Sequence, residues 1–140
     1  MDINKRNDRG IQRHAIAMQR VCSLGIITFR QLEWMEACAN VVDLSVTGVG
    51  IESEARLEPG FVWFKDRVGG HRGGVLMWSR QDGHGGRYRS GIKFVNLSRD
   101  EEQYVQAQVA WSRPHTPVRD PEAIIDTIIH SLKKEAYPDS

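Results

Sequence analysis

The sequence predicts a mostly β fold, a sandwich or a small barrel of antiparallel strands followed by two helices. Up to about residue 97, short apolar runs alternate with glycine-rich turns, which is typical of antiparallel sheets. After residue 98, the apolar spacing changes to that of amphipathic helices, and helix-capping signals appear. A chain of 140 residues is long enough for one domain that buries a core of its own.

The β part is expected to consist of short strands that are separated by turns rich in glycine or proline. The strand-like and apolar stretches cover residues 15–29, 33–51 with a break near 39–40, 61–64, 75–78 and 88–95. The turns between them are marked by Pro59-Gly60, by the glycines within 69–74 and by the segment RQDGHGG at 80–86.

The stretch VVDLSVTGVGI, Val41 to Ile51, alternates apolar and polar residues at the period of a strand. The apolar face is expected to carry Val42, Leu44 and Val46, and the polar face Asp43, Ser45 and Thr47. Aspartate is a poor strand former. Its place on the polar face therefore needs a reason beyond solvent exposure.

Two helices are expected at the C-terminal end. Ser98 and Glu101 form a capping box, and the helix after it is expected to run to about Trp111. Asp120-Pro121 starts a second helix, with Asp as the N-cap and Pro at the first helical position. This helix has an isoleucine-rich stripe, which would either cap one mouth of the barrel or form a dimer or partner surface. The stripe consists of Ile124, Ile125, Ile128, Ile129 and Leu132.

Composition and charge exclude several classes of protein. The net charge of +1 argues against a protein that binds long nucleic acid mainly by electrostatics. The basic residues near the N-terminus suit a small anion better. No apolar run approaches the ~20 residues of a membrane helix, and the start of the sequence does not resemble a signal peptide. We therefore expect a cytoplasmic protein, with Cys22 and Cys38 as buried, reduced thiols.

Two short motifs carry the chemistry. Arg9-x-x-x-Arg13 presents two guanidinium groups, which bind phosphate bidentately and also match the O6 and N7 atoms of guanine. Asp43-x-Ser45-x-x-Gly48 offers a carboxylate, a hydroxyl and a residue without a side chain. Each motif alone also fits a bland interpretation: a solvated arginine-rich segment and a solvent-facing strand that ends in a glycine turn.

Taken together and in order over residues 9 to 94, these features resemble the PilZ domain. RxxxR is followed by DxSxxG at the end of a strand and by a hydrophobic residue after the glycine. The further features of the resemblance are Pro59-Gly60 before a strand, Val75-x-x-Trp78 and Gly91-Ile-x-Phe94.

The resemblance implies a six-stranded antiparallel barrel that acts as a receptor for cyclic di-GMP, a bacterial second messenger, and not as an enzyme. Asp43 and Ser45 would face outward and bind a guanine edge, while Gly48 would let the ligand approach the backbone and would tolerate a positive φ. Arg9 and Arg13 would close over the ligand. Trp78 would stack on a guanine, or alternatively pack in the core.

The same resemblance divides the chain into a flexible arm (1–14), a barrel (15–97) and C-terminal helices (98–140) that pack on the barrel or on a partner. The ligand would order the arm, and the ordered arm would signal to a protein partner. The receptor would be a monomer or a homodimer and would need no cofactor or metal. Two alternatives stay open: a PilZ-fold interaction module that has lost nucleotide binding, and a small barrel that binds single-stranded nucleic acid.

Overall fold

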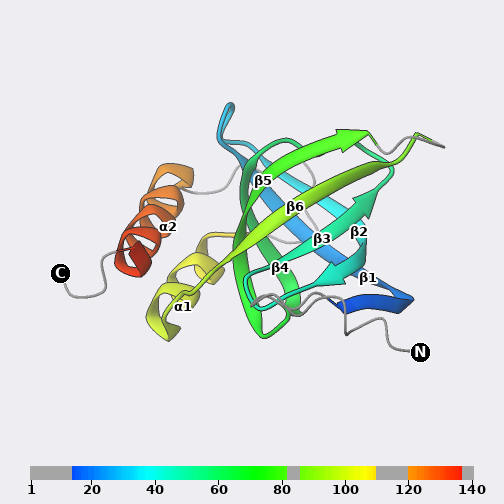
Figure 1. Cartoon of the computed structure of the whole chain (residues 1–140). Helices are drawn as coiled ribbons and strands as arrows, with labels where there is room; N and C mark the ends of the chain where they lie inside the picture. The colour runs from blue at the N-terminus through cyan, green and yellow to red at the C-terminus, as the bar shows by residue number, and fades with distance from the viewer. Residues whose placement is uncertain (1–13, 82–85, 110–119, 137–140) are drawn as a thin grey trace.

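The computed structural model describes residues 14–81, 86–109 and 120–136, and in this part of the chain it shows a six-stranded barrel with two helices on one side (Figure 1). All strands pair antiparallel and the sheet closes in the order β1-β2-β3-β6-β5-β4. The predicted fold class is therefore confirmed. The elements are β1 (His14–Thr28), β2 (Trp34–Leu44), β3 (Gly48–Ser53), β4 (Gly60–Val68), β5 (His71–Gln81), β6 (Tyr88–Val95), α1 (Arg99–Gln108) and α2 (Pro121–Ala136).

Strand β4 buries apolar side chains on both of its faces. In β4, Val62 and Phe64 point into the barrel and join its interior core, whereas Phe61 and Trp63 point outward and join a second hydrophobic cluster with the helices. This alternation follows from the period of two in a strand. A run of four apolar residues, FVWF, is thus explained by burial on both sides.

The helices begin as the capping signals predict. The Ser98 side chain accepts a hydrogen bond from the backbone N–H of Glu101, and the Glu101 carboxylate accepts one from the backbone N–H of Ser98. Asp120 caps α2 by accepting from the N–H of Ala123 at 3.1 Å. The stripe on α2 packs on the barrel through fully buried Ile124, while Ile129 stays 44% exposed.

Several turns differ from their predicted positions. The break in the 33–51 region falls at 45–47 and not near residues 39–40, which lie inside β2 and pair with β1. The glycine-rich break is only two residues long: Gly69 and Gly70 have positive φ and close the β4–β5 hairpin, which suits a residue without a Cβ. Gly73 and Gly74 belong to β5.

Three burial predictions are wrong. Val42 is not on the core face, because the pairing of β2 with β3 shifts register between Val41 and Asp43, and Val41 takes the inward position. Val46 is 78% exposed at the tip of the turn. Cys22 is buried as expected, but Cys38 is exposed because it points outward from the next strand. None of the helices in the described ranges is long and apolar enough to cross a membrane.

Candidate functional site

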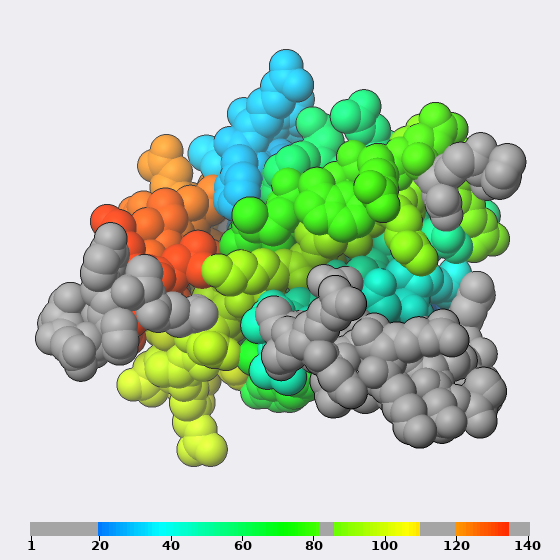
Figure 2. Space-filling model, viewed as in Figure 1, coloured from blue at the N-terminus to red at the C-terminus, as the bar shows by residue number. Residues whose placement is uncertain are grey.

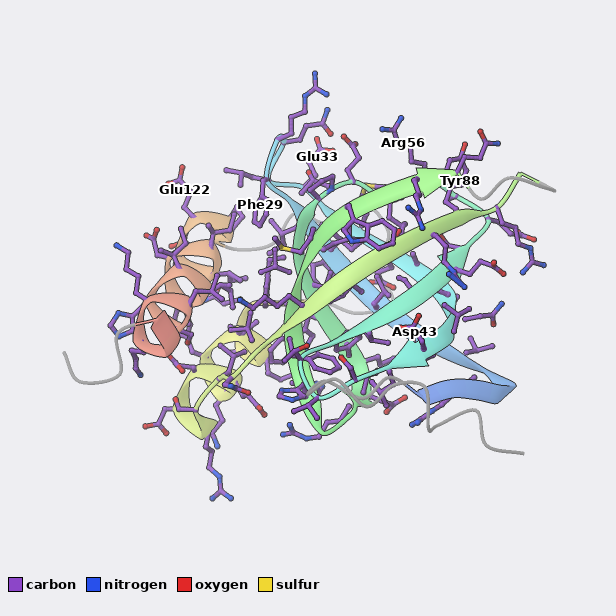
Figure 3. All side chains as sticks on the ribbon, in the orientation of Figure 1. Phe29, Glu33, Asp43, Arg56, Tyr88 and Glu122 are labelled. Atoms are coloured by element: carbon purple, nitrogen blue, oxygen red, sulfur yellow. The ribbon has the colours of Figure 1, made fainter. Side chains whose placement is uncertain are left out.

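Four neighbouring strands contribute one residue each to a row across the outer face of the barrel. Asp43 of β2 pairs with Gly50 of β3, Gly50 pairs with Gly91 of β6, and Gly91 pairs with Trp78 of β5. This row, which we call the glycine row, thus has a carboxylate at one end, an indole at the other and two glycines between them. Figure 3 shows Asp43 near the end of β2, beside β3.

The two glycines of the row leave space that the end residues fill. A Cβ on Gly50 would lie 2.8 Å from a carboxylate oxygen of Asp43, and a Cβ on Gly91 would lie 2.4 Å from Nε1 of Trp78. Both distances are far shorter than an ordinary contact of roughly 3.5–4.0 Å. The Asp43 carboxylate and the Trp78 indole therefore lean over the glycines, toward each other.

A β-bulge precedes each end of the row. The β2–β3 register shifts between Val41 and Asp43, and the β5–β6 register shifts between Leu76 and Trp78. A bulge adds one residue to a strand and re-aims the side chains that follow it. As a result Asp43 and Trp78 point outward, and Trp78 is 44% exposed and not a core residue.

A pocket of about 230 Å³ lies over this row. Besides Asp43 and Trp78, it is lined by two basic side chains of β6, Arg89 and Lys93, which the sequence interpretation did not single out. They occupy alternate outward positions with Gly91 between them, so the strand pattern of β6 was the signal that could have found them. Figure 2 shows part of the outer surface of β5 and β6, coloured green to yellow-green, that α1 and α2 leave uncovered.

Ser45 does not face outward as predicted; it is 7% exposed and stabilises the β2–β3 turn. Its hydroxyl accepts hydrogen bonds from the backbone N–H groups of Thr47 and Gly48 and contacts the carbonyl oxygen of Gly48 at 3.3 Å. These contacts fix the turn that joins Asp43 to the pocket floor.

Gly48 has a packing role in place of the predicted positive φ. Positive φ occurs at three glycines of the described residues, and Gly48 is not one of them. A Cβ at this position would lie 2.4 Å from the carbonyl oxygen of Ile92 on β6. The missing side chain therefore allows β3 and β6 to approach each other at the pocket.

Arginines surround the indole end of the pocket. The guanidinium of Arg80 lies over the Trp78 ring, 5.0 Å from its centroid. Arg89 pairs with Arg80 across β5 and β6 and with Glu52 across β3 and β6. Glu52 itself forms an ion pair with Arg87 at 3.2 Å.

Arg9 and Arg13 lie outside the described residues. The first described strand nevertheless enters the barrel beside the pocket, because Ala15 of β1 pairs with Asp43 of β2. No group of three or more His, Cys, Asp or Glu side chains is placed to hold a metal ion in the described ranges. His71 stacks on Phe94, with ring centroids 4.2 Å apart.

The model of the PilZ domain family matches residues 19–114, which is more than half of the chain. The chain belongs to the PilZ domain family. PilZ domains form a family of cyclic di-GMP-binding modules that are not known as enzymes. The matched part of this PilZ chain contains Asp43, Ser45, Gly48 and Trp78, whereas both arginines of RxxxR precede it. A search of curated proteins found no match.

Proposed function

We propose that this protein is a receptor for cyclic di-GMP that binds one guanine of the ligand in the pocket over the glycine row. The observation that carries the proposal is the register that aligns Asp43, Gly50, Gly91 and Trp78 across four strands. A carboxylate accepts hydrogen bonds from guanine N–H groups, and an exposed indole offers a face for stacking. The two glycines let the carboxylate and the indole lie low over the strands, so that both can contact one purine base in the pocket.

The pocket is small, which supports a binding site to which groups outside the pocket also contribute. At about 230 Å³, it is smaller than the roughly 300–1,000 Å³ of most ligand pockets. One base fits such a volume better than a whole cyclic dinucleotide does. The remaining base and the phosphates would then be covered by other groups, a role that the proposal gives to Arg9 and Arg13.

Chain connectivity supports this role of the arm. His14 pairs with Leu44, and Arg13 is its neighbour in the sequence, one Cα step of about 3.8 Å away. Arg9 is five residues before His14, within roughly 18 Å of it at full extension. Both guanidinium groups can therefore reach a ligand that lies beside Asp43. Ordering of the arm by the dianionic ligand would present a new surface to a protein partner.

Ser45 has an indirect part in this proposal. Its hydroxyl is engaged by the turn that ends at Gly48, so its main effect is to position the Asp43 carboxylate and the strand that carries Gly50. A direct hydrogen bond from Ser45 to the ligand stays a prediction. We propose no catalytic step, because the pocket offers recognition groups for a base and an anion.

Calorimetric titration with cyclic di-GMP tests the proposal, with GTP as a competing guanine nucleotide. Each charge-assisted hydrogen bond contributes about 1.5–3 kcal/mol. Arg13→Ala and Asp43→Ala are therefore expected to weaken binding by roughly tenfold or more. Arg30→Ala is the matched control, because Arg30 is exposed in the β1–β2 turn, away from the end of β1 that adjoins Asp43.

The second candidate function is a PilZ-fold module that binds a protein partner without the nucleotide. One observation favours it: the family match begins at residue 19, after both arginines of the arm. No heat with cyclic di-GMP at high micromolar concentration, from a folded protein, would refute the receptor proposal and favour this candidate.

A further inference from the structure

The outer face of the barrel carries a second row beside the glycine row, and its charges are arranged unusually. Glu52 of β3, Arg89 of β6 and Arg80 of β5 are consecutive partners across three strands. Directly opposed residues in an antiparallel pair have Cβ atoms about 4.5–5.5 Å apart, and like charges in such positions destabilise the sheet. Arg80 and Arg89 are such a pair.

The single carboxylate of this row is shared. Oε1 of Glu52 accepts a hydrogen bond from Nη1 of Arg87 at 3.2 Å. Glu52 thus faces two arginines, and the row with Arg87 holds three guanidinium groups against one carboxylate. The local excess of positive charge lies at the edge of the pocket over the glycine row, which Arg89 lines.

Within the described residues, one arginine of the opposed pair has a buried donor without a partner, and the other is held only by an exposed contact with a ring. Nε of Arg89 is buried and makes no hydrogen bond there. A buried donor without a partner is uncommon and costs free energy. Arg80 is exposed, and its guanidinium lies on the Trp78 ring, a contact that is weak at an exposed position.

We propose that Arg80 and Arg89 together bind a phosphodiester group of the ligand whose base lies over the glycine row. We call these two residues the phosphate clamp. The proposal rests on the proposed function for the identity of the ligand. The phosphate bridges the two opposed guanidinium groups and removes their repulsion. It also supplies an acceptor next to the Nε–H of Arg89.

The clamp also explains how Trp78 becomes available to the base. In the structure the guanidinium of Arg80 covers one face of the indole. A base that stacks on that face displaces the guanidinium, which then turns to the phosphate. Binding exchanges an exposed cation–π contact for base stacking and a charge-assisted hydrogen bond, and the latter is the stronger kind of contact.

Nuclear magnetic resonance of arginine Nε–Hε groups tests the clamp directly. The 15N-labelled full-length protein is titrated first with inorganic pyrophosphate and then with cyclic di-GMP. Arg80→Lys and Arg89→Lys assign the two signals, and Arg30→Lys identifies a control arginine at the other end of β1. Both signals of the clamp are expected to shift with either probe, with saturation, while the Arg30 signal stays in place.

Calorimetry of Arg80→Ala and Arg89→Ala completes the test. Each substitution is expected to lower the affinity for cyclic di-GMP about tenfold or more, and to make binding less sensitive to salt because fewer charges are neutralised. The double variant is expected to lose less than the product of the single losses, since both residues contact one phosphate.

The outcomes separate the two proposals. Cyclic di-GMP binding that both alanine variants retain within twofold, with unmoved Arg80 and Arg89 signals, overturns the clamp and leaves the receptor function standing. Shifts with pyrophosphate but no binding of the dinucleotide support the clamp as an anion site and overturn the receptor function.

Discussion

Gly91→Ala and Gly48→Ala make the same chemical change at two positions of the pocket floor, and the structure predicts different results. The new Cβ would lie 2.4 Å from Nε1 of Trp78 in the first case and 2.4 Å from the carbonyl oxygen of Ile92 in the second. Each contact must lengthen by about 1 Å or more to become ordinary. What differs is whether the neighbouring atom can move.

The Trp78 indole can move, because it is 44% exposed at the barrel surface. Alanine also stabilises by about 0.4–1 kcal/mol through the unfolded chain where the backbone conformation suits it. The free energy of unfolding of Gly91→Ala is therefore expected to lie within about 1 kcal/mol of the parent. Affinity for cyclic di-GMP is expected to fall roughly tenfold, since stacking contributes about 1–3 kcal/mol per base.

The carbonyl group of Ile92 cannot move in this way, because it belongs to the backbone of β6 where that strand pairs with β3. Gly48→Ala is expected to cost about 1–3 kcal/mol through overpacking. For a chain of this length, that lowers the melting temperature by roughly 3–10 °C. Scanning calorimetry measures the stability and titration calorimetry measures the affinity.

Equal destabilisation by both substitutions would refute the reasoning, because it would mean that the indole is held as rigidly as the backbone. A Gly91→Ala variant that binds the ligand as tightly as the parent would also contradict it, since Trp78 would then not form a wall of the binding site.

The remaining predictions concern the core, a helix and the thiols. Ile128→Ala, at 2% exposure, is expected to cost about 2–5 kcal/mol in urea unfolding. Burial tends to raise the pKa of Glu101, but hydrogen bonds from Ser98 and Ser131 and the charge of Lys134 lower it overall. The Glu101 carboxylate therefore contributes to stability above its unfolded pKa of about 4.3, and this contribution is lost as the pH falls through the folded pKa. In Glu101→Gln, the free energy of unfolding is expected to depend less on pH in that range. Burial raises the pKa of Cys22 to about 11, so a thiol reagent at pH 8 is expected to label exposed Cys38 first; equal rates would contradict this.

Local signals in the sequence predicted the fold and part of the pocket correctly. The capping residues Ser98 and Asp120 depend on interactions within one turn of helix, so their structure follows from neighbours in the sequence. The alternation in β6 is equally local and gave its limits, Tyr88 and Val95. The motifs with Asp43 and Trp78 led to two side chains that the structure brings to one pocket.

The features that could not be predicted from the sequence depend on the register of the strands, which is the alignment of each strand with its neighbours in the sheet. A shift of one residue moves every side chain of a strand to the other face. The bulge after Val41 makes such a shift, and the faces predicted for Val42 and Ser45 were wrong for this reason and because the chain turns at 45–47. The pairing of Gly50 with Gly91 joins residues far apart in the sequence, and the opposition of Arg80 and Arg89 depends on the register of β5 against β6, which shifts between Leu76 and Trp78.

The second hydrophobic cluster limits how this protein can be shortened for experiments. Phe61 and Trp63 point outward from β4, and together with Val75 and Val95 they are covered in a cluster that includes residues of α1 and α2. An isolated barrel that ends after β6 would expose these side chains as one apolar surface, and such surfaces promote aggregation. A fragment for crystallisation or fusion should therefore keep both helices, even where only the nucleotide pocket is of interest.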